Sequence, residues 1–394
     1  MIVIKRIAST ALAILLAGCQ TLSDSADHEP AIVSDAKLDR IAAAAMSQTG
    51  AQGLAIAVTE PGRVLAAGAW GKRNANGDPL TADTIMYGAS LTKTAFAYFV
   101  EQLANEGKLD LDAPIARFLP RPLPEYTDPN GRYAPWDHLA SDPRWQLITP
   151  RMALSHSTGF ANFYWDNPGE KLTIHFTPGS RYSYSGDGLI LLQFALEKGL
   201  GLDVGADMQR RIFARFGMVN TSMVWRADFA RNLADGWKAD GTIEPHDERS
   251  KVRAAGSMDT TIADMARLAA GIAADRRAFA ALARPQLGIT TVTQFPTLQG
   301  EAPVERRIPG LAAGLGVVAF EGPQGPGWYK GGHNDSTGNT WVCLVRTGRC
   351  VVILANDVRA EAAFPGIVRS LLGETGAPWQ WEYGAQPWTT ASPR

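Results

Sequence analysis

The chain has 394 residues, of which 45% are hydrophobic and 20% are charged, with 38 Lys and Arg against 39 Asp and Glu. At about 150 residues per domain, this length corresponds to two or three compact units, or to one catalytic unit with two lobes. A net charge of −1 gives no electrostatic signature of nucleic-acid binding, and no apolar run of about 20 residues follows the N-terminal region. We therefore expect a globular body that binds no nucleic acid and does not span a membrane.

The first 19 residues have the pattern of a bacterial export signal. Two basic residues precede a mostly apolar stretch over 7–17, and the sequence Leu-Ala-Gly-Cys ends at Cys19. This ending resembles a lipoprotein lipobox, which implies a signal peptide over 1–18, lipid attached to Cys19 and a polar tether over 19–31. Gln20 follows, where an aspartate would indicate inner-membrane retention, so a periplasm-facing lipoprotein of the outer membrane is expected. An ordinary secretion signal is the alternative.

The pattern of apolar residues and turn signals predicts the elements in chain order. They are a helix over 34–48, a β-hairpin of 54–59 and 64–70, a helix over 90–106, a mixed, largely helical region over 109–310, strands over 339–346 and 350–356, and a helix over 362–372. Because strands lie at both ends of the chain, we expect one sheet built from distant segments. The Trp-rich tail over 376–394 is expected to pack on the body.

Two cysteines flank the last predicted hairpin, and their pairing depends on its turn. If the loop is centred between Arg346 and Thr347, Cys343 faces Cys350, and a disulfide can form in an oxidising compartment. If Thr347 and Gly348 form a two-residue turn, the cysteines are not opposed. Two buried free thiols are the alternative to the disulfide.

The sharpest chemical signal is Ser90-Leu-Thr-Lys93 at the start of the helix predicted over 90–106. Residues three apart lie on one helix face, so the hydroxyl of Ser90 and the ammonium of Lys93 can meet. A serine hydroxyl is a weak nucleophile until a base takes its proton, and a lysine is such a base only when its pKa is lowered. By itself this spacing more often marks a capping serine beside a surface lysine.

Two further motifs follow in order, Tyr184-Ser-Gly186 and Lys330-Gly-Gly-His333. The ordered set resembles the penicillin-recognising serine hydrolases, which comprise class C β-lactamases, D,D-peptidases and related esterases. Connecting segments resemble the family too, so the resemblance covers roughly residues 33–375. It implies an α+β, β-lactamase/transpeptidase-like fold over 32–375, in which an antiparallel sheet flanked by helices lies beside a mostly helical lobe.

The resemblance assigns a role to each motif residue. Ser90 is expected to be the acylated nucleophile, Lys93 the group that takes its proton, and Tyr184 the second member of the proton relay. Lys330 is expected to favour loss of the phenolic proton and to attract anionic substrate groups. The backbone N–H groups of Ser90 and His333 are expected to form the oxyanion hole.

Two departures from the family pattern bear on the substrate. Gly186 replaces an asparagine that contacts the nucleophile-helix lysine and the substrate's acylamino group, and Gly331, followed by Gly332, replaces a threonine that helps to hold a substrate carboxylate. The resemblance therefore favours a small-molecule carboxylic ester or amide as substrate. The alternatives are a D,D-carboxypeptidase or β-lactamase acting on peptide-like or β-lactam substrates, and a catalytically silent lipoprotein that binds a partner in the cell envelope.

No cofactor or metal is expected. The six histidines lack metal-ligand spacing, and Gly314-Leu-Gly316 opens no helix that would bind a dinucleotide. His156 is interpreted as a packing residue, whereas for the side chain of His333 packing and substrate contact are equally open. Asp187 and Trp165 are weaker candidates for the cleft wall. The oligomeric state is left open.

Overall fold

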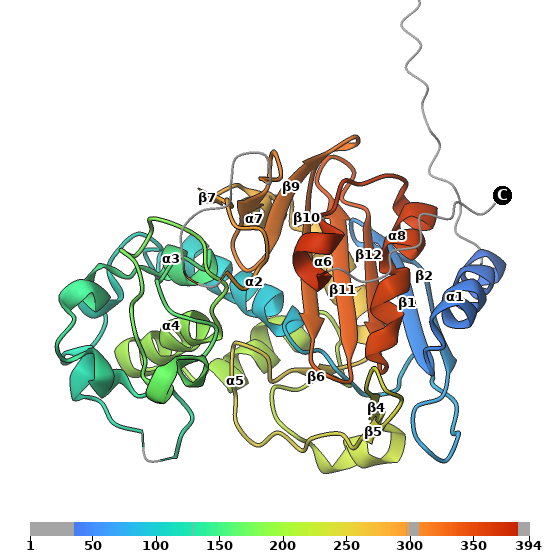
Figure 1. Ribbon diagram of the computed structural model, residues 1–394, viewed down its shortest axis with the longest axis horizontal. Coiled ribbons are helices and arrows are strands. Elements are labelled where there is room, and N and C mark those ends of the chain that lie inside the picture. Colours follow the sequence, from blue (N-terminus) through green and yellow to red (C-terminus); the bar gives the residue numbers. More distant parts are fainter. Residues whose placement is uncertain (1–34, 129, 297, 299–306, 385–394) are drawn as a thin grey trace, which may run out of the picture. The chain divides into compact units, whose positions relative to one another are not determined.

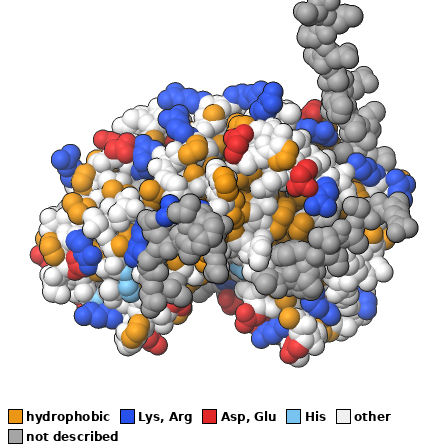
Figure 2. Space-filling model, turned by 45° about the horizontal axis from the view of Figure 1, so that its top comes forward, with side chains coloured by type: hydrophobic (Ala, Val, Ile, Leu, Met, Phe, Trp, Pro, Cys, Tyr) orange, Lys and Arg blue, Asp and Glu red, His pale blue; other side chains and the backbone are white. Residues whose placement is uncertain are grey.

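The computed structural model describes residues 35–128, 130–296, 298 and 307–384, and the elements given below belong to this part of the chain. The predicted signal peptide, the tether and Cys19 lie outside the described residues. None of the described helices is both long and apolar enough to cross a bilayer. On the face shown in Figure 2, Lys and Arg side chains are interspersed with Asp and Glu.

In the described residues, an eight-stranded antiparallel sheet is built from segments near both ends of the chain (Figure 1). Its order is β2 (Arg63–Gly71), β1 (Gly53–Glu60), β12 (Cys350–Ala355), β11 (Gly338–Leu344), β10 (Gly325–His333), β9 (Val318–Gly322), β8 (Ala312–Ala313) and β7 (Leu287–Gly288). Ile56 of β1 lies opposite Ile353 of β12. The prediction of one sheet built from distant segments is confirmed.

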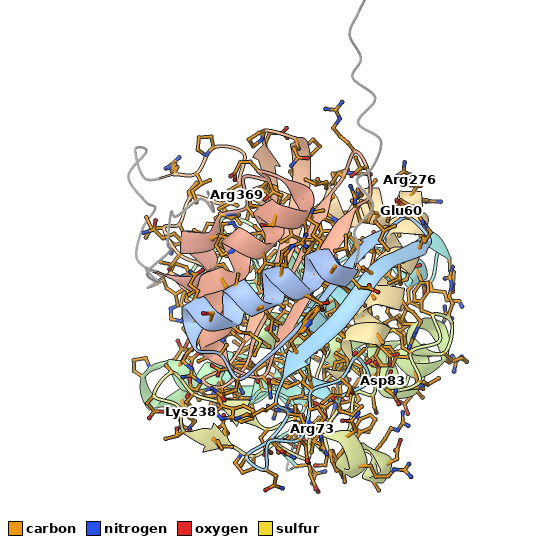
Figure 3. The ribbon with its side chains drawn as sticks, turned by 90° about the vertical axis from the view of Figure 1, so that its right-hand side faces the viewer. Glu60, Arg73, Asp83, Lys238, Arg276 and Arg369 are labelled. Carbon is orange, nitrogen blue, oxygen red and sulfur yellow. A yellow bond between two sulfur atoms is a disulfide. The ribbon has the colours of Figure 1, made fainter. Side chains whose placement is uncertain are left out.

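Helices cover both faces of the sheet. α1 (Asp35–Thr49) and α8 (Phe364–Leu372) lie over one face, as Figure 3 shows, whereas α2 (Leu91–Asn105), α6 (Ile262–Ala274) and α7 (Arg276–Ala283) belong to the other side. Successive side chains of a strand point to opposite faces. In β1 the larger side chains of Leu54, Ile56 and Val58 therefore face α1 and α8, while alanines face α6, and the strand reads as one continuous apolar run.

A mostly helical lobe, coloured green in Figure 1, contains α3 (Pro150–Leu154), α4 (Gly186–Gly199) and α5 (Val204–Met208). Two small sheets pair β3 (Met86–Tyr87) with β6 (Asp259–Thr260) and β4 (Gly236–Trp237) with β5 (Ile243–Glu244). The remaining described helices are short. They are 3-10 helices at Ile115–Arg117, Leu123–Glu125, Trp136–Leu139, Pro143–Leu147, Tyr164–Asp166, Pro168–Glu170, Ala227–Asn232 and Val358–Ala363, a π-helical turn at Gln209–Phe213, and α9 at Trp379–Tyr383. This arrangement is the predicted α+β fold.

The late hairpin settles the alternatives for the cysteines. Cys343 of β11 lies directly opposite Cys350 of β12, with 4.1 Å between their Cα atoms, and the two form a disulfide. The turn is closed by hydrogen bonds from the Leu344 N–H to the Arg349 carbonyl and from the Gly348 N–H to the Leu344 carbonyl. Both cysteines are buried on the α6 side of the sheet.

Candidate active site

Ser90 lies at the turn that leads into α2. It is the N-cap residue of this helix, yet its hydroxyl makes no capping hydrogen bond. Ala89 before it has a φ of 45°, a left-handed conformation that is uncommon for residues other than glycine and is often found at functional sites. The hydroxyl of Ser90 is thereby directed away from the helix end and toward the cleft.

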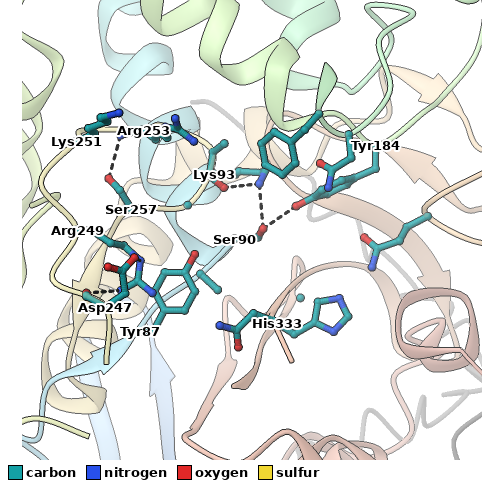
Figure 4. Close-up of a pocket in the computed structure, with 18 of the residues that line it drawn as sticks. Tyr87, Ser90, Lys93, Tyr184, Asp247, Arg249, Lys251, Arg253, Ser257 and His333 are labelled. Carbon is teal, nitrogen blue, oxygen red and sulfur yellow. Dashed lines mark hydrogen bonds and ion pairs between the residues drawn. The ribbon is translucent and has the colours of Figure 1, made fainter. Parts of the chain in front are cut away.

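Two side chains meet this hydroxyl (Figure 4). The Nζ of Lys93 donates a hydrogen bond to Ser90 Oγ at 2.9 Å, and the phenol of Tyr184 donates another at 2.8 Å. Lys93 also donates to the carbonyl of Ala255. Its side chain is 1% exposed, and burial, reinforced by the charge of Lys330, lowers its pKa. A lysine with a lowered pKa next to a serine is what a general base requires.

Lys330 approaches Tyr184 from β10. Its Nζ lies 4.9 Å from the centre of the tyrosine ring, the same distance as the Nζ of Lys93. The Lys330 ammonium donates to the carbonyl of Gly331 at 2.7 Å, and burial lowers its pKa. The structure thus brings together Ser90, Lys93, Tyr184 and Lys330, which the sequence places far apart.

Gly332 allows β10 to approach the nucleophile. A Cβ at this position would lie 3.0 Å from the backbone nitrogen of Ser90, tighter than ordinary van der Waals contact. His333 follows directly and lines the same cleft. Its Nδ1 lies 3.1 Å from Glu361 Oε1, and although burial acts against the charged imidazole, the Glu361 carboxylate raises the pKa of His333 overall.

The imidazole ring of His156 packs against the ring of Tyr184. The two rings stack with 4.3 Å between their centres, and the Nδ1 of His156 accepts a hydrogen bond from the Ser185 N–H at 3.1 Å. Burial lowers the pKa of His156 well below its usual range, so the ring stays neutral. His156 is therefore a packing residue, as the sequence suggested, and it positions the phenol.

A cleft of about 520 Å³ is lined by Ser90, Lys93, Tyr184, Gly331 and His333. Sequence reasoning missed most of its walls, because they come from segments that match no motif. The added lining residues include Tyr87, Asn162, Phe163, Asp247, Glu248, Arg249, Ser250, Lys251, Arg253, Gln294, Phe295 and Glu382.

Two of these residues fill the space beside the glycines that depart from the family pattern. A Cβ at Gly186 would lie 2.5 Å from a ring carbon of Phe163, and a Cβ at Gly331 would overlap the carboxylate of Glu382. A phenyl ring and a carboxylate therefore stand next to the two motif positions at which the family carries polar, uncharged side chains.

The weaker candidates Asp187 and Trp165 are not among the cleft-lining residues. The Asp187 carboxylate is buried at the start of α4 and accepts a hydrogen bond from the Tyr164 N–H at 2.6 Å, and burial raises its pKa to about 7. Trp165 is exposed and stacks on Phe163. Within the described ranges, no group of three or more His, Cys, Asp or Glu side chains is arranged to hold a metal ion.

The hydrogen bonds of Ser90 Oγ go to a lysine and a tyrosine, and not to a histidine. Serine hydrolases of the Ser–Lys type have this arrangement, and it defines the class of the present site. The protein family described as Beta-lactamase matches residues 38–370, and the chain therefore belongs to the β-lactamase family.

The chain is also similar to individual proteins. The chain is 27% identical over 202 residues to Esterase EstB of Burkholderia gladioli, a match that covers 48% of this chain and 51%, about half, of that esterase. Two solved structures share the fold. The octameric penicillin-binding protein homologue from Pyrococcus abyssi has a TM-score of 0.65 at 18% identity, and the match covers 87% of this chain and 78% of the homologue's chain. D-alanine carboxypeptidase AmpC from Burkholderia cenocepacia has a TM-score of 0.62 at 17% identity, and the match covers 85% of this chain and 97% of that protein.

Proposed function

We propose that this protein hydrolyses carboxylic esters of small molecules through an acyl-enzyme on Ser90. The observation that carries the proposal is the hydrogen bonding of Ser90 Oγ by both Lys93 and Tyr184 at the floor of the cleft. The similarity to an esterase supports esters as the substrate class.

The reaction has two steps. In acylation, Ser90 Oγ attacks the ester carbonyl carbon while its proton passes to Lys93, and the relay through Tyr184 delivers a proton to the departing alkoxide as the C–O bond breaks. In deacylation, water gives a proton to the same relay, its oxygen attacks the acyl carbon, and Ser90 regains a proton as the acid leaves. A group that takes up a proton in one half-step must give it back in the next. Lys93 and Tyr184 can do so because both are hydrogen-bonded to Ser90 Oγ.

In the proposed mechanism, backbone groups stabilise the negative charge that develops on the substrate. The N–H groups of Ser90 and His333 would bind the oxyanion of the tetrahedral intermediate, and removing one such donor typically lowers the rate by about 10² to 10³. Ser90 also lies at the N-terminus of α2, where the helix dipole favours negative charge. Both contributions act only once charge develops on the substrate oxygen.

The cleft wall favours an apolar acyl group. Phe163 fills the space beside Gly186, and the ring of Phe295 lies edge-on to Tyr184 with 5.2 Å between ring centres. Burial of apolar substrate surface against these rings contributes about 25 cal/mol per Å². A simple ester with an alkyl or aryl acyl chain fits such a wall better than a polar acylamino side chain does.

Covalent labelling tests the proposal. A fluorophosphonate probe is expected to label the wild-type protein and Ser250→Ala but not Ser90→Ala, since Ser250 also lines the cleft whereas it is Ser90 that is hydrogen-bonded by Lys93 and Tyr184. A fluorescent penicillin is expected to label the protein weakly or not at all. If the penicillin is the better reagent and is turned over, the β-lactamase or peptidase alternative replaces the esterase. If neither reagent modifies the wild type, the hydrolase proposal is wrong.

A further inference from the structure

Glu382 brings a carboxylate into the cleft from the end of α9. The residue is 6% exposed and lines the cleft together with Gly331 and His333. Its Oε2 accepts a hydrogen bond from the Tyr329 hydroxyl at 3.1 Å, and its backbone carbonyl accepts one from the Gln294 side chain at 3.0 Å. One hydrogen bond therefore holds the carboxylate of Glu382 and another holds its backbone.

This carboxylate lies directly over Gly331. A Cβ on Gly331 would overlap Glu382 Oε1 and would lie 2.6 Å from Cδ and 2.9 Å from Cγ. At this point β10 is paired on one side alone, because β9 pairs with residues 325–329 whereas β11 pairs with residues 327–333. Among the described residues, the stretch over 330–333 thus has an edge without a partner strand, and a substrate that extends along it passes the carboxylate.

On the Gly331 side of the cleft, carboxylates of the protein itself act on the basic side chains. Lys330 is the nearest lysine in sequence to Gly331, and the charge of Glu382 raises its pKa against the larger effect of burial. The imidazole of His333 is paired with Glu361. A substrate carboxylate placed here would meet an imidazole that already has an anionic partner and a lysine that already feels the charge of Glu382.

On the opposite wall of the cleft, two of the basic side chains are hydrogen-bonded to backbone carbonyls and not to carboxylates. Arg249 is paired with the buried Asp259 at 3.2 Å, but Lys251 and Arg253 donate to backbone carbonyls, those of Asn130 and Gly131. Figure 4 shows these cationic side chains on the side of Ser90 away from His333. This wall also carries the carboxylates of Asp247 and Glu248, but both are exposed, whereas the carboxylate on the Gly331 side, that of Glu382, is buried.

We propose that Glu382 determines the specificity of the cleft: it excludes esters that carry a carboxylate on the group lying along Gly331, and it selects esters that are uncharged there. The inference rests on the proposed function and names the substrate class of the same site. Two carboxylates a few ångströms apart in a buried site repel each other strongly, and discrimination of this kind acts by penalising the wrong ligand.

Aryl boronic acids test the proposal, since their boron accepts Ser90 Oγ without any turnover. The pair is 3-carboxyphenylboronic acid and its 3-carboxamide analogue, which differ in charge but little in shape. Calorimetric titration of the wild type is expected to show at least about tenfold tighter binding of the carboxamide. Glu382→Gln is expected to reduce this ratio about tenfold by strengthening the binding of the carboxylate.

Glu248→Gln is the matched control, because Glu248 is an exposed glutamate on the cleft wall formed by residues 247–253. This variant should leave the ratio unchanged. An equal shift in Glu248→Gln, or an unchanged ratio in Glu382→Gln, overturns the proposal. If Glu382→Gln does not fold, Gly331→Ala replaces it, since the added Cβ must displace the carboxylate and should shift the ratio in the same direction; an unchanged ratio there counts equally against the proposal.

The same titration separates this inference from the function on which it rests. If the wild type binds neither boronic acid, or if Ser90→Ala binds both as tightly as the wild type does, the proposed serine chemistry is wrong and the inference falls with it. If both boronic acids bind through Ser90 and their affinity ratio is the same in Glu382→Gln as in the wild type, the specificity inference alone is wrong.

Discussion

Lys93 can accept a proton from Ser90 only in its uncharged form, and its surroundings favour that form. Burial and the neighbouring Lys330 lower its pKa. Below that lowered pKa the ammonium persists and cannot act as a base. We therefore expect kcat/KM for p-nitrophenyl butyrate to fall as the pH falls through the pKa of Lys93.

Replacement of this lysine by arginine gives a sharper result. Arginine keeps its charge at every accessible pH, so Lys93→Arg should lower kcat by about 10² to 10⁴ at all pH values. Steady-state kinetics between pH 5 and pH 10, with circular dichroism to verify folding, measure the effect. Activity of Lys93→Arg within a factor of about ten of the wild type would show that another group is the base.

Asp187 predicts a pH dependence of stability. Its carboxyl ionises near pH 4 in an unfolded chain, whereas burial raises its pKa to about 7 in the folded protein. Between these values the folded state retains a proton that the unfolded state has lost, so the contribution of Asp187 to stability declines as the pH rises from about 4 to about 7 and stays level above that.

Asp187→Asn removes this titration and keeps an acceptor for the Tyr164 N–H. The variant should be more stable than the wild type at pH 8 by a few kcal/mol, since one pKa unit corresponds to about 1.4 kcal/mol, and the gain should shrink toward pH 5. Urea unfolding at both pH values measures the difference. A difference that does not change with pH contradicts the assignment.

At the scale of elements, the disulfide between Cys343 and Cys350 ties two neighbouring strands across a short loop. Closing a loop of about eight residues stabilises the folded state by about 2 to 3 kcal/mol in the chain-entropy account. Cys343→Ala/Cys350→Ala should lower the free energy of unfolding by that amount. Ester hydrolysis at 25 °C should persist, because neither cysteine lines the cleft.

Urea unfolding of the double variant and of the wild type, each with and without a thiol reductant, measures this contribution. The reductant should destabilise the wild type but not the variant. Equal stability of the two proteins under oxidising conditions would mean that the β11–β12 pairing alone holds the hairpin.

Elements with strong periodicity were predictable from the sequence, and short ones were not. The boundaries of α2 lie one residue inside the predicted helix, because its apolar stripe and the following Gly107 mark both. α9 has five residues, too few for a period, so the approach of Glu382 to Gly331 appears only once the chain has folded. The charged run over 247–253 is typical of a solvated surface, yet it forms one wall of the cleft.

At the scale of the whole molecule, the sequence predicted the sheet and the convergence of its motifs because the family resemblance spans nearly the whole body. It did not predict which side chains fill the places of the missing asparagine and threonine. Phe163 and Glu382 come from segments remote from Gly186 and Gly331, and only three-dimensional packing joins them. In the function proposed above, these two side chains, and not the motifs alone, set the substrate class.

The membrane attachment of the molecule remains a prediction from the N-terminal sequence. We propose that Cys19 is lipidated, so labelled palmitate should enter the wild type in a bacterial host and should be absent from Cys19→Ser. Several acyl chains, at about 0.8 kcal/mol per buried CH₂, would hold the protein firmly at a membrane. Membrane-free wild-type protein without label would favour the ordinary secretion signal.

The position of β12 between β1 and β11 has a consequence for the timing of folding. A growing chain that has not yet reached residue 350 lacks the strand that joins its first hairpin to the rest of the sheet, and one that ends before residue 382 lacks a wall of the cleft. Pairings between such distant segments form late and slowly. The cleft is therefore assembled only after the segments around residues 350 and 382 have both been synthesised.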